Sequence, residues 1–412
     1  MQIFGDCVRI LGGAFLLSLS VSAQTFTTLY NFGSQDYDGA FPSAGVIRGP
    51  RGELYGTTDR GGEWNDGTVY ELLPPASPGG AWTELVLHSF NGQDGAYPLA
   101  GLRMGPRGEL YGVASQSTGG DGAVFELDPP AGASAQWLYT VIYRFTDLNG
   151  NPSGGLVFGP GRSLYGVAQA GDGNVYSLTP PSAAGGAWIQ STVFSFPGGS
   201  GGREPFGTLA VGAKATLLGV TRNGGRPFPG GGGGGTVYSL TPPAESGGSW
   251  TWRLHYAFNE ETGDGAQPMA GVIVGPGGVL YGTTTHGGGG GWGTVFALTP
   301  VEVSGVPMKE TILYSFTGTN GSDDGSSLVL GPSGVLYGTT YDGGANGCGM
   351  VFQLAPPASP GGSWSTIILY SFEGGADGFG PNGPVLGPDG TLYGTTENAG
   401  AHNNGTVFSV TP

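Results

Sequence analysis

The sequence is poor in cysteine, and this limits how the chain can be stabilised. Its two cysteines are Cys7 and Cys348, and Cys7 lies in a segment that we expect to be removed after export. Cys348 would then have no partner within the chain, so no intrachain disulfide is predicted. Exported proteins often depend on such bonds, and here stability must come from the fold itself.

Basic residues are also scarce, since 14 Lys and Arg stand against 30 Asp and Glu for a formal net charge of −16. A surface of this sign repels nucleic acid and anionic membranes, so we expect neither as a partner. Beyond the N-terminus, no run approaches the ~20 consecutive apolar residues of a membrane-spanning helix, and no membrane span is predicted. The charge fits solubility outside the cell or the attraction of cations.

Motifs that would identify an enzyme are missing as well. The glycine-rich segments lie between predicted strands and lack the Gly-Lys-Ser or Gly-Lys-Thr of a phosphate loop. A nucleophile elbow requires a strand-to-helix turn, and no helix is predicted. Among the four histidines, His88 and His255 fall in predicted strands, while His286 and His402 lie in loops of different repeats. The sequence favours a non-enzymatic role, although a site assembled from several repeats stays open.

Glycine and proline, by contrast, are abundant, at 87 and 31 of the 412 residues. Such a share indicates disorder unless a period accompanies it, and here one does. An apolar-aromatic-glycine step recurs seven times, with successive spacings of 56, 54, 53, 63, 56 and 56 residues. Its second residue stands at Tyr55, Tyr111, Tyr165, Leu218, Tyr281, Tyr337 and Tyr393. A constant period in this range indicates a solenoid, a repeat array or a propeller.

Each repeat can be divided into four short strands, as the sixth copy illustrates. Apolar segments at 327–330, 335–340, 350–354 and 364–372 are separated by turns rich in glycine and proline. Apolar residues at nearly consecutive positions indicate sheets that are covered on both faces. Glycine in the middle of the second strand, such as Gly56, is costly in isolation, and we expect a neighbouring sheet to approach closely there.

These features predict an all-β fold, a seven-bladed β-propeller of four-stranded antiparallel blades in one domain over residues 24–412. Radial stacking buries both faces of each blade, whereas the alternative, a linear β-solenoid, has no room for four strands in each coil. Residues 26–32 have the pattern of a fourth strand and residues 405–410 that of a third strand. We expect the N-terminal strand to pair with the C-terminal blade, which closes the ring and covers both edges.

Residues 1–23 have the pattern of a secretory signal peptide. Arg9 precedes the apolar run 10–17, and small residues end at Ala23, as at a cleavage site. We therefore expect a secreted protein, extracellular or periplasmic. An unstructured or strand-forming N-terminus is the alternative.

The repeat also resembles a known family. Leu392–Thr396 has the sequence Leu-Tyr-Gly-Thr-Thr, and after a loop Gly405–Phe408 has the sequence Gly-Thr-Val-Phe. This pattern resembles the GloVer tandem repeat of exported bacterial proteins over essentially all of residues 24–412. The fourth copy departs most, since Leu218 replaces the aromatic residue. The resemblance implies an exported repeat protein, and it implies no activity, catalytic residue or cofactor.

Loops between second and third strands should share one face of the ring with the connections from blade to blade. The connections carry Asp-Gly pairs at Asp38, Asp94, Asp264, Asp324 and Asp377, with Asn149 and Glu204 at the corresponding points of two others. We interpret these aspartates mainly as turn residues. Together they could instead surround one channel mouth, where carboxylate oxygens would suit calcium. No other cofactor is predicted.

Aromatic residues fall into two groups. Five tryptophans begin fourth strands and should pack between blades: Trp82, Trp137, Trp188, Trp250 and Trp364. Others lie on the glycine-rich loops of the face just described: Trp64, Trp292, Phe228, Tyr341 and His286. Trp64 and Trp292 are candidates for stacking on a sugar or anchoring a protein, with loop capping as the alternative.

The sequence thus favours a secreted, monomeric, non-enzymatic propeller that binds a glycan, a protein or a cell-surface component through its loop-rich face. Two alternatives stay open. One is a metal-dependent hydrolase or lyase with a site at the channel mouth, and the other is a structural extracellular component.

Overall fold

Glycine and proline divide the chain into short strands, as the repeat pattern predicts. The computed structural model describes residues 24–77, 79–117, 122–132, 135–146, 150–183, 185–226, 233–245, 247–259, 263–301, 307–322, 326–359 and 361–412. The expected signal peptide, Asn149, Phe228 and Asp324 lie outside these residues. Among the described residues no helix is long and apolar enough to cross a membrane.

The strands form seven antiparallel blades, each described from its inner to its outer strand. Blade 1 has β3 (Ile47–Arg48), β4 (Leu54–Thr58), β6 (Thr68–Leu73) and β7 (Thr83–Ser89). Blade 2 has β8 (Arg103–Met104), β9 (Leu110–Ala114), β10 (Ala123–Asp128) and β11 (Leu138–Arg144). Blade 3 has β12 (Val157–Phe158), β13 (Leu164–Ala168), β14 (Asn174–Thr179) and β15 (Ile189–Ser195).

The next three blades repeat this order. Blade 4 has β16 (Arg203–Val211), β17 (Leu217–Asn223), β18 (Thr236–Thr241) and β19 (Thr251–Ala257). Blade 5 has β21 (Ile273–Val274), β22 (Leu280–Thr284), β24 (Thr294–Thr299) and β25 (Lys309–Ser315). Blade 6 has β26 (Val329–Leu330), β27 (Leu336–Thr340), β28 (Met350–Ala355) and β29 (Ser365–Ser371).

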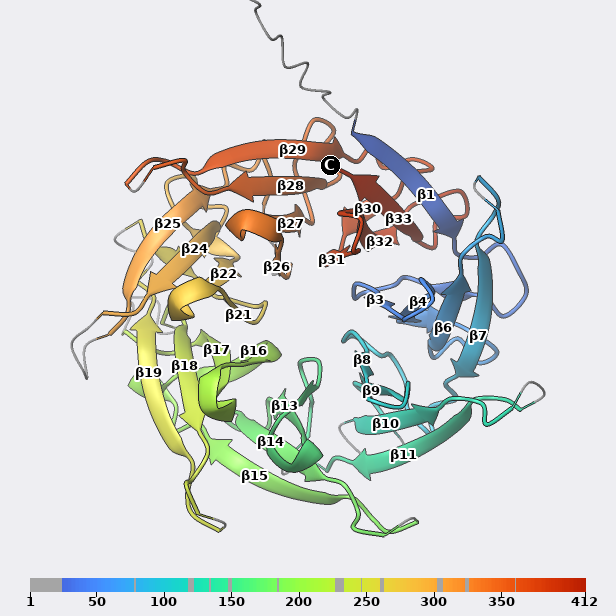
Figure 1. Ribbon diagram of the computed structural model, residues 1–412, viewed down its shortest axis with the longest axis horizontal. Coiled ribbons are helices and arrows are strands. Elements are labelled where there is room, and N and C mark those ends of the chain that lie inside the picture. The colour runs from blue at the N-terminus through green and yellow to red at the C-terminus, as the bar shows by residue number, and fades with distance from the viewer. Residues whose placement is uncertain are drawn as a thin grey trace, which may run out of the picture.

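Blade 7 joins the two ends of the chain. It has β31 (Val385–Leu386), β32 (Leu392–Asn398) and β33 (Thr406–Thr411), with β30 (Phe379–Pro381) beside β32, and its outer strand is β1 (Thr25–Asn31). β1 pairs antiparallel with β33, from Thr25 opposite Thr411 to Asn31 opposite Thr406. Figure 1 shows this strand completing the ring, which confirms the predicted seven-bladed, closed propeller.

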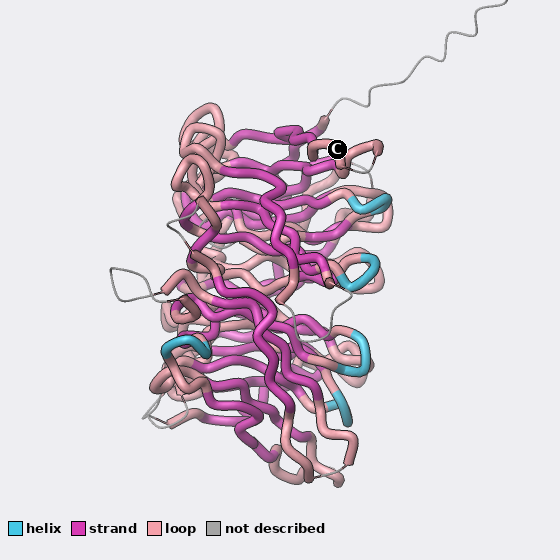
Figure 2. The backbone as a smooth tube through the Cα atoms, turned by 90° about the vertical axis from the view of Figure 1, so that its left-hand side faces the viewer, coloured by secondary structure: helices cyan, strands magenta, loops and turns pink. Residues whose placement is uncertain are grey.

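The two faces of the ring carry different loops. The connection face carries the blade-to-blade connections, the loops between second and third strands and the small pairs β2 (Gly39–Ala40) with β5 (Arg60–Gly61) and β20 (Gly265–Ala266) with β23 (His286–Gly287). The turn face carries the turns between first and second strands. The 3₁₀ turns η1 (Pro160–Arg162), η3 (Ala213–Ala215), η5 (Pro276–Gly278) and η6 (Pro332–Gly334) lie there, opposite η2 (Gly199–Gly201) (Figure 2).

The glycine of the repeated step makes room for an aromatic ring, but the source of that ring differs from our prediction. A Cβ at Gly56 would lie 2.9 Å or less from ring atoms of Tyr70, which is its register partner in the same blade. The expectation of close approach by a neighbouring sheet is therefore wrong. The glycine instead lets the third-strand ring lie flat on its own sheet, and the opposite side of that ring faces the neighbouring blade.

A buried phenylalanine at the end of each outer strand makes the contact across the interface. Each packs edge-on against the third-strand aromatic of the following blade, with ring centroids 5.0–5.8 Å apart. The seven pairs are Phe32–Tyr70, Phe90–Phe125, Phe145–Tyr176, Phe196–Tyr238, Phe258–Phe296, Phe316–Phe352 and Phe372–Phe408. Edge-to-face pairs add about 0.5–1.5 kcal/mol each to the free energy of burial. The hydrophobic core is thus a ring of separate interblade clusters.

The tryptophans that begin outer strands pack between blades, as predicted. Each lies edge-on to the step tyrosine of the preceding blade, in the pairs Trp82–Tyr393, Trp137–Tyr55, Trp188–Tyr111, Trp250–Tyr165 and Trp364–Tyr281. These contacts close five of the seven interfaces near the turn face.

Candidate functional site

A cavity of about 520 Å³ lies on the propeller axis at the connection face, and all seven blades line it. Its wall consists mainly of the short segments that lead into each first strand. These segments contain small residues because they touch one another. A Cβ added to Gly271 would collide with the carbonyl oxygen of Thr208, and one added to Gly45 would collide with that of Gly383. The channel wall is therefore largely backbone.

The backbone turns sharply where each segment enters the cavity. A residue in the left-handed region precedes a proline in six blades, and its φ is between 52° and 69°. These residues are Phe41, Tyr97, Asn151, Glu204, Gln267 and Gly380. A left-handed conformation brings Cβ close to the following carbonyl oxygen, so the five non-glycine residues there carry backbone strain. Strain of this kind clusters at functional sites.

The residue after that proline lines the cavity, and its type varies among the blades. The residues at this position are Ser43, Leu99, Ser153, Phe206, Met269 and Asn382. Leu99 is 54% exposed, although it is apolar. Asn382 donates a hydrogen bond to the carbonyl oxygen of Pro42 across the interface at 2.8 Å. The wall thus combines apolar side chains with polar ones that are held in place.

Glu397 and Tyr341 supply the main polar side chains of the cavity. Tyr341 directly follows the second strand β27, and Glu397 lies near the end of the second strand β32. Burial and the charge of Asp59 raise the pKa of Glu397, while hydrogen bonds with Tyr341 and Asn398 partly offset that rise. Asn398 donates a hydrogen bond to the Tyr341 hydroxyl at 3.2 Å. A carboxyl, a phenol and an amide therefore meet at the junction of blades 6 and 7.

This polar group continues into blades 1 and 2. Burial raises the pKa of Asp59, although the adjacent Arg60 lowers it in part. The Arg60 guanidinium bonds the Asp59 carboxylate at 3.1 Å and lies over the ring of Tyr97 at 4.2 Å from its centroid. Acceptors, donors and an aromatic face thus extend from Glu397 over the connection face, although Asp59, Arg60 and Tyr97 do not line the cavity.

The predicted aspartates lie on the connection face but away from the cavity. Asp38, Asp264 and Asp377 accept hydrogen bonds from the hydroxyls of outer-strand tyrosines, namely Tyr30, Tyr256 and Tyr370, at 2.8–3.0 Å. They also accept backbone N–H groups of their own connection. Of the four aspartates that the structure describes, none lines the cavity. Each of the three ties a connection to its outer strand, in keeping with a turn residue.

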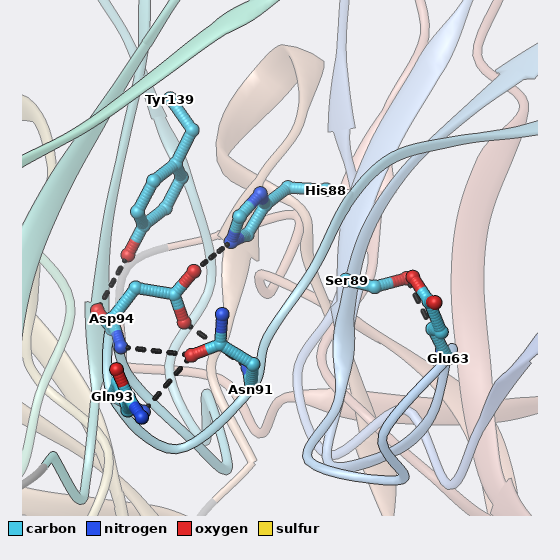
Figure 3. A network of polar contacts seen from close by, with 7 residues as sticks. All are labelled: Glu63, His88, Ser89, Asn91, Gln93, Asp94 and Tyr139. Carbon is cyan, nitrogen blue, oxygen red and sulfur yellow. Dashed lines mark hydrogen bonds and ion pairs between the residues drawn. The ribbon is translucent and has the colours of Figure 1, made fainter.

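Asp94 is also held to its outer strand, but by a histidine in place of a tyrosine. His88 Nε2 lies 3.0 Å from Asp94 Oδ2, and the His88 ring stacks on Tyr139 of the next blade with centroids 3.7 Å apart (Figure 3). Tyr139 donates its hydroxyl proton to the carbonyl oxygen of Asp94 at 2.8 Å. The hydrogen bond from His88 and backbone N–H groups lower the pKa of Asp94 despite its burial. The pair bridges two blades at the outer edge, at a position where five other blades have tyrosine and blade 3 has Phe194.

Carboxylates close enough to share a metal ion occur elsewhere. Within the described ranges, Glu109, Glu126 and Asp128 are the group whose oxygens lie within 4.8 Å of one another. They lie in blade 2 near the turn face, where Arg107 bonds Glu109 and Tyr111 donates to Glu126 at 2.7 Å. Calcium binding by the connection aspartates stays a prediction.

Trp64 and Trp292 are exposed, as a role in binding requires. Their side chains are 59% and 52% exposed on loops between second and third strands of blades 1 and 5. Neither lines the axial cavity. Trp292 packs beside Gly318, whose added Cβ would lie 3.0 Å from the indole. The structure therefore separates these tryptophans from Glu397 and Tyr341.

Sequence reasoning placed Tyr341 on the correct face but missed Glu397, Asp59 and the residues after the prolines. A signal for them was present. Proline stands four residues after Asp38, Asp94, Asp264 and Asp377, and the position after it varies while its neighbours stay small. A position that varies among repeats while its neighbours stay constant is not required by the fold, so it indicates a surface that can serve another role.

Comparison with known proteins agrees with the fold. Residues 11–231 and 227–412 match the model of the Gloeobacter/Verrucomicrobia repeat. No curated protein matched the sequence.

Solved structures with similar folds share little sequence. A candidate 6-phosphogluconolactonase from Bacteroides uniformis has a TM-score of 0.55 and 14% identity, over 83% of this chain and 88% of that one. A candidate 6-phosphogluconolactonase from Bacteroides fragilis has a TM-score of 0.53 and 15% identity, over 85% and 87%. Polysaccharide lyase Uly1 has a TM-score of 0.50 and 14% identity, over 93% of each. At this identity the likeness concerns the fold alone.

Proposed function

Because this chain belongs to the Gloeobacter/Verrucomicrobia repeat family and folds as a closed propeller, we propose that it is a secreted, non-enzymatic binding module. Its ligand is a neutral glycan, which binds at the axial cavity of the connection face. The observation that carries the proposal is the meeting of Glu397, Tyr341 and Asn398 at a cavity lined by all seven blades.

The chemistry of the cavity suits a sugar. Sugars offer hydroxyls that donate and accept hydrogen bonds, together with apolar ring faces that pack on aromatic or aliphatic side chains. Glu397, Asn398 and the exposed backbone provide the polar partners, and Phe206 and Leu99 line the apolar side. The volume of about 520 Å³ lies in the usual range of ligand pockets.

The net charge of the chain narrows the class of glycan that we expect to bind. A net charge of −16 disfavours polyanionic glycans. Trp64 and Trp292 would then extend the site over the loops if the ligand is a long chain. A protein partner at the same loops is the less favoured form of the proposal, because the cavity is concave and largely backbone.

The test is binding to a glycan array and to cell-wall fractions. Wild-type protein should retain one or more neutral glycans, and Glu397→Gln should weaken that binding at least tenfold because the amide replaces an acceptor with a donor. Glu373→Gln is the matched control, since Glu373 is exposed on the blade 6 to blade 7 connection. Loss of binding in Trp64→Ala and Trp292→Ala, with Glu397→Gln unchanged, would move the site to the loops. No retention of any neutral glycan would refute the proposal.

The raised pKa values of Glu397 and Asp59 favour one second candidate, a hydrolase or lyase at the same mouth. A raised pKa shifts a carboxyl toward the protonated form that a general acid requires. Release of reducing ends or unsaturated sugars from a bound glycan, with and without a chelator, would distinguish this activity and any need for metal. Binding without product release would support the binding module.

A further inference from the structure

The interface between blades 4 and 5 lacks the aromatic pair that fills the interfaces on either side of it. At five interfaces a tryptophan eight residues before the outer-strand phenylalanine meets the step tyrosine of the preceding blade. Between blades 4 and 5 both partners are smaller, because Leu218 replaces the tyrosine and Met308 replaces the tryptophan. Two rings are thus missing from the same place.

A cavity of about 400 Å³ lies at this interface on the turn face. Leu218 and Met308 line it together with Leu280, Val274 and Val301. These side chains form the apolar part of the wall, and the polar part includes Arg253, Ser239 and three threonines. Apolar cavities left by smaller side chains accept aromatic molecules of matching size.

A third replacement places a histidine in the polar part of the wall. His255 lines it, at a position where the other outer strands have leucine, isoleucine or valine, namely Leu29, Leu87, Ile142, Val193, Leu313 and Leu369. His255 Nε2 lies 2.8 Å from the Ser239 hydroxyl, whereas Nδ1 is buried and bonds no group among the described residues. Leaving a buried polar atom without a partner costs about 1–3 kcal/mol. Three changes at one interface therefore leave a space with an apolar side and one hydrogen-bonding atom without a partner among the described residues.

The protonation of His255 completes the chemistry. Burial, with Arg253 nearby, lowers the pKa of His255 to about 4. The imidazole is therefore neutral at pH 7, so one ring nitrogen carries a proton and the other does not. A ligand hydroxyl suits either arrangement, because it donates and accepts hydrogen bonds.

We propose that this cavity is a binding site for a small phenolic molecule. The ring would fill the space that Tyr and Trp fill at five other interfaces, and the hydroxyl would bond Nδ1 of His255. This site is separate from the axial cavity, since it lies on the opposite face and shares no lining residue with it. Its occupation is therefore independent of glycan binding.

The test uses p-cresol, which is the side chain of tyrosine as a free molecule, and toluene, which lacks the hydroxyl. Calorimetric titration of the purified full chain should give one p-cresol site, with at least fivefold tighter binding than for toluene. Leu218→Tyr restores the residue of the other six repeats and should abolish binding of both probes. His255→Leu, the residue type of most other outer strands, should make p-cresol bind no more tightly than toluene.

Tyr281→Phe at the next interface is the matched control and should leave both affinities within twofold. Met308→Trp is a second filling variant, and it should also abolish binding if Leu218→Tyr does not fold. The proposal is overturned if p-cresol does not saturate one site. It is equally overturned if binding survives in a folded filling variant, or if His255→Leu keeps the preference for p-cresol.

Discussion

Substituting Gly338 by Ala tests whether the repeated glycine exists to admit the aromatic ring beside it. In β27, a Cβ at Gly338 would lie 2.6 Å from Cζ of Phe352 and 2.9 Å from Cδ2 of Leu328. Carbon atoms in favourable contact are about 3.5–4.0 Å apart, so the ring must move by about 1 Å. It cannot move freely, because Phe352 is fully buried and packs edge-on against Phe316 of the preceding blade.

The expected cost follows from two opposing effects. Overpacking a buried site costs about 1–3 kcal/mol, while replacing glycine by alanine stabilises by about 0.4–1 kcal/mol through the unfolded chain. We therefore expect Gly338→Ala to lower the free energy of unfolding by about 1–2 kcal/mol. The assay is urea unfolding followed by tryptophan fluorescence, with the transition midpoint compared at equal slope.

Two further variants make this prediction sharp. Gly289→Ala is the control, because no heavy atom lies within 4 Å of its added Cβ and its φ is not positive. It should be neutral or slightly stabilising. Adding Phe352→Leu to Gly338→Ala should cost less than the sum of the single changes, since the smaller side chain relieves the collision. Equal midpoints for Gly338→Ala and wild type would refute the reasoning.

The blade interfaces support three other predictions. Burial and the charge of Asp38 raise the pKa of Glu84 from 4.5 to about 8, so the folded state keeps a proton that the unfolded state loses. The free energy of unfolding should therefore fall as pH rises from about 4.5 to 8 and then level off. Glu84→Gln should flatten this profile and stabilise the protein at pH 8 by roughly 2–4 kcal/mol, and an unchanged profile would contradict the assignment. Phe26→Ala removes the stack on Tyr370, whose centroid is 3.8 Å away, and should cost about 2 kcal/mol in thermal or urea unfolding; a change below the error would show that ring closure does not depend on this contact. His88→Tyr should stay within about 0.5 kcal/mol of wild type in the same assay, because tyrosine fills that position in other blades, whereas His88→Ala should cost about 1 kcal/mol or more; equal losses would contradict the shared role.

The fold could be predicted from the sequence because the residues that specify each blade recur from repeat to repeat. The spacing of the step from Tyr55 to Tyr393 counts the blades, and the fourth-strand pattern of residues 26–32 predicts closure onto β33. The role of Gly56 was harder to predict. Sequence spacing shows that something approaches it, but only the register shows that the ring comes from Tyr70 in the same sheet.

The candidate site was harder to predict from the sequence. The repeat pattern shows on which face of the ring a loop lies, but it does not show how far the loop lies from the axis. Asp38 was placed on the correct face, yet its bond to Tyr30 keeps it near the outer strand. Glu397 and Tyr341 reach the axis because they lie at the ends of second strands, which are closer to the centre. The sequence showed that the fourth copy departs from the pattern at Leu218. It did not predict the cavity between blades 4 and 5, because that cavity also depends on Met308 and His255, which are far from Leu218 in sequence.

The pairing of β1 with β33 also orders events in time. Thr25 meets Thr411, so β1 cannot pair until the six intervening blades and the inner strands of blade 7 have been made. Contacts between such distant residues form slowly. Until then β1 has no partner in its sheet, and its unpaired backbone groups are open to pairing with another extended chain.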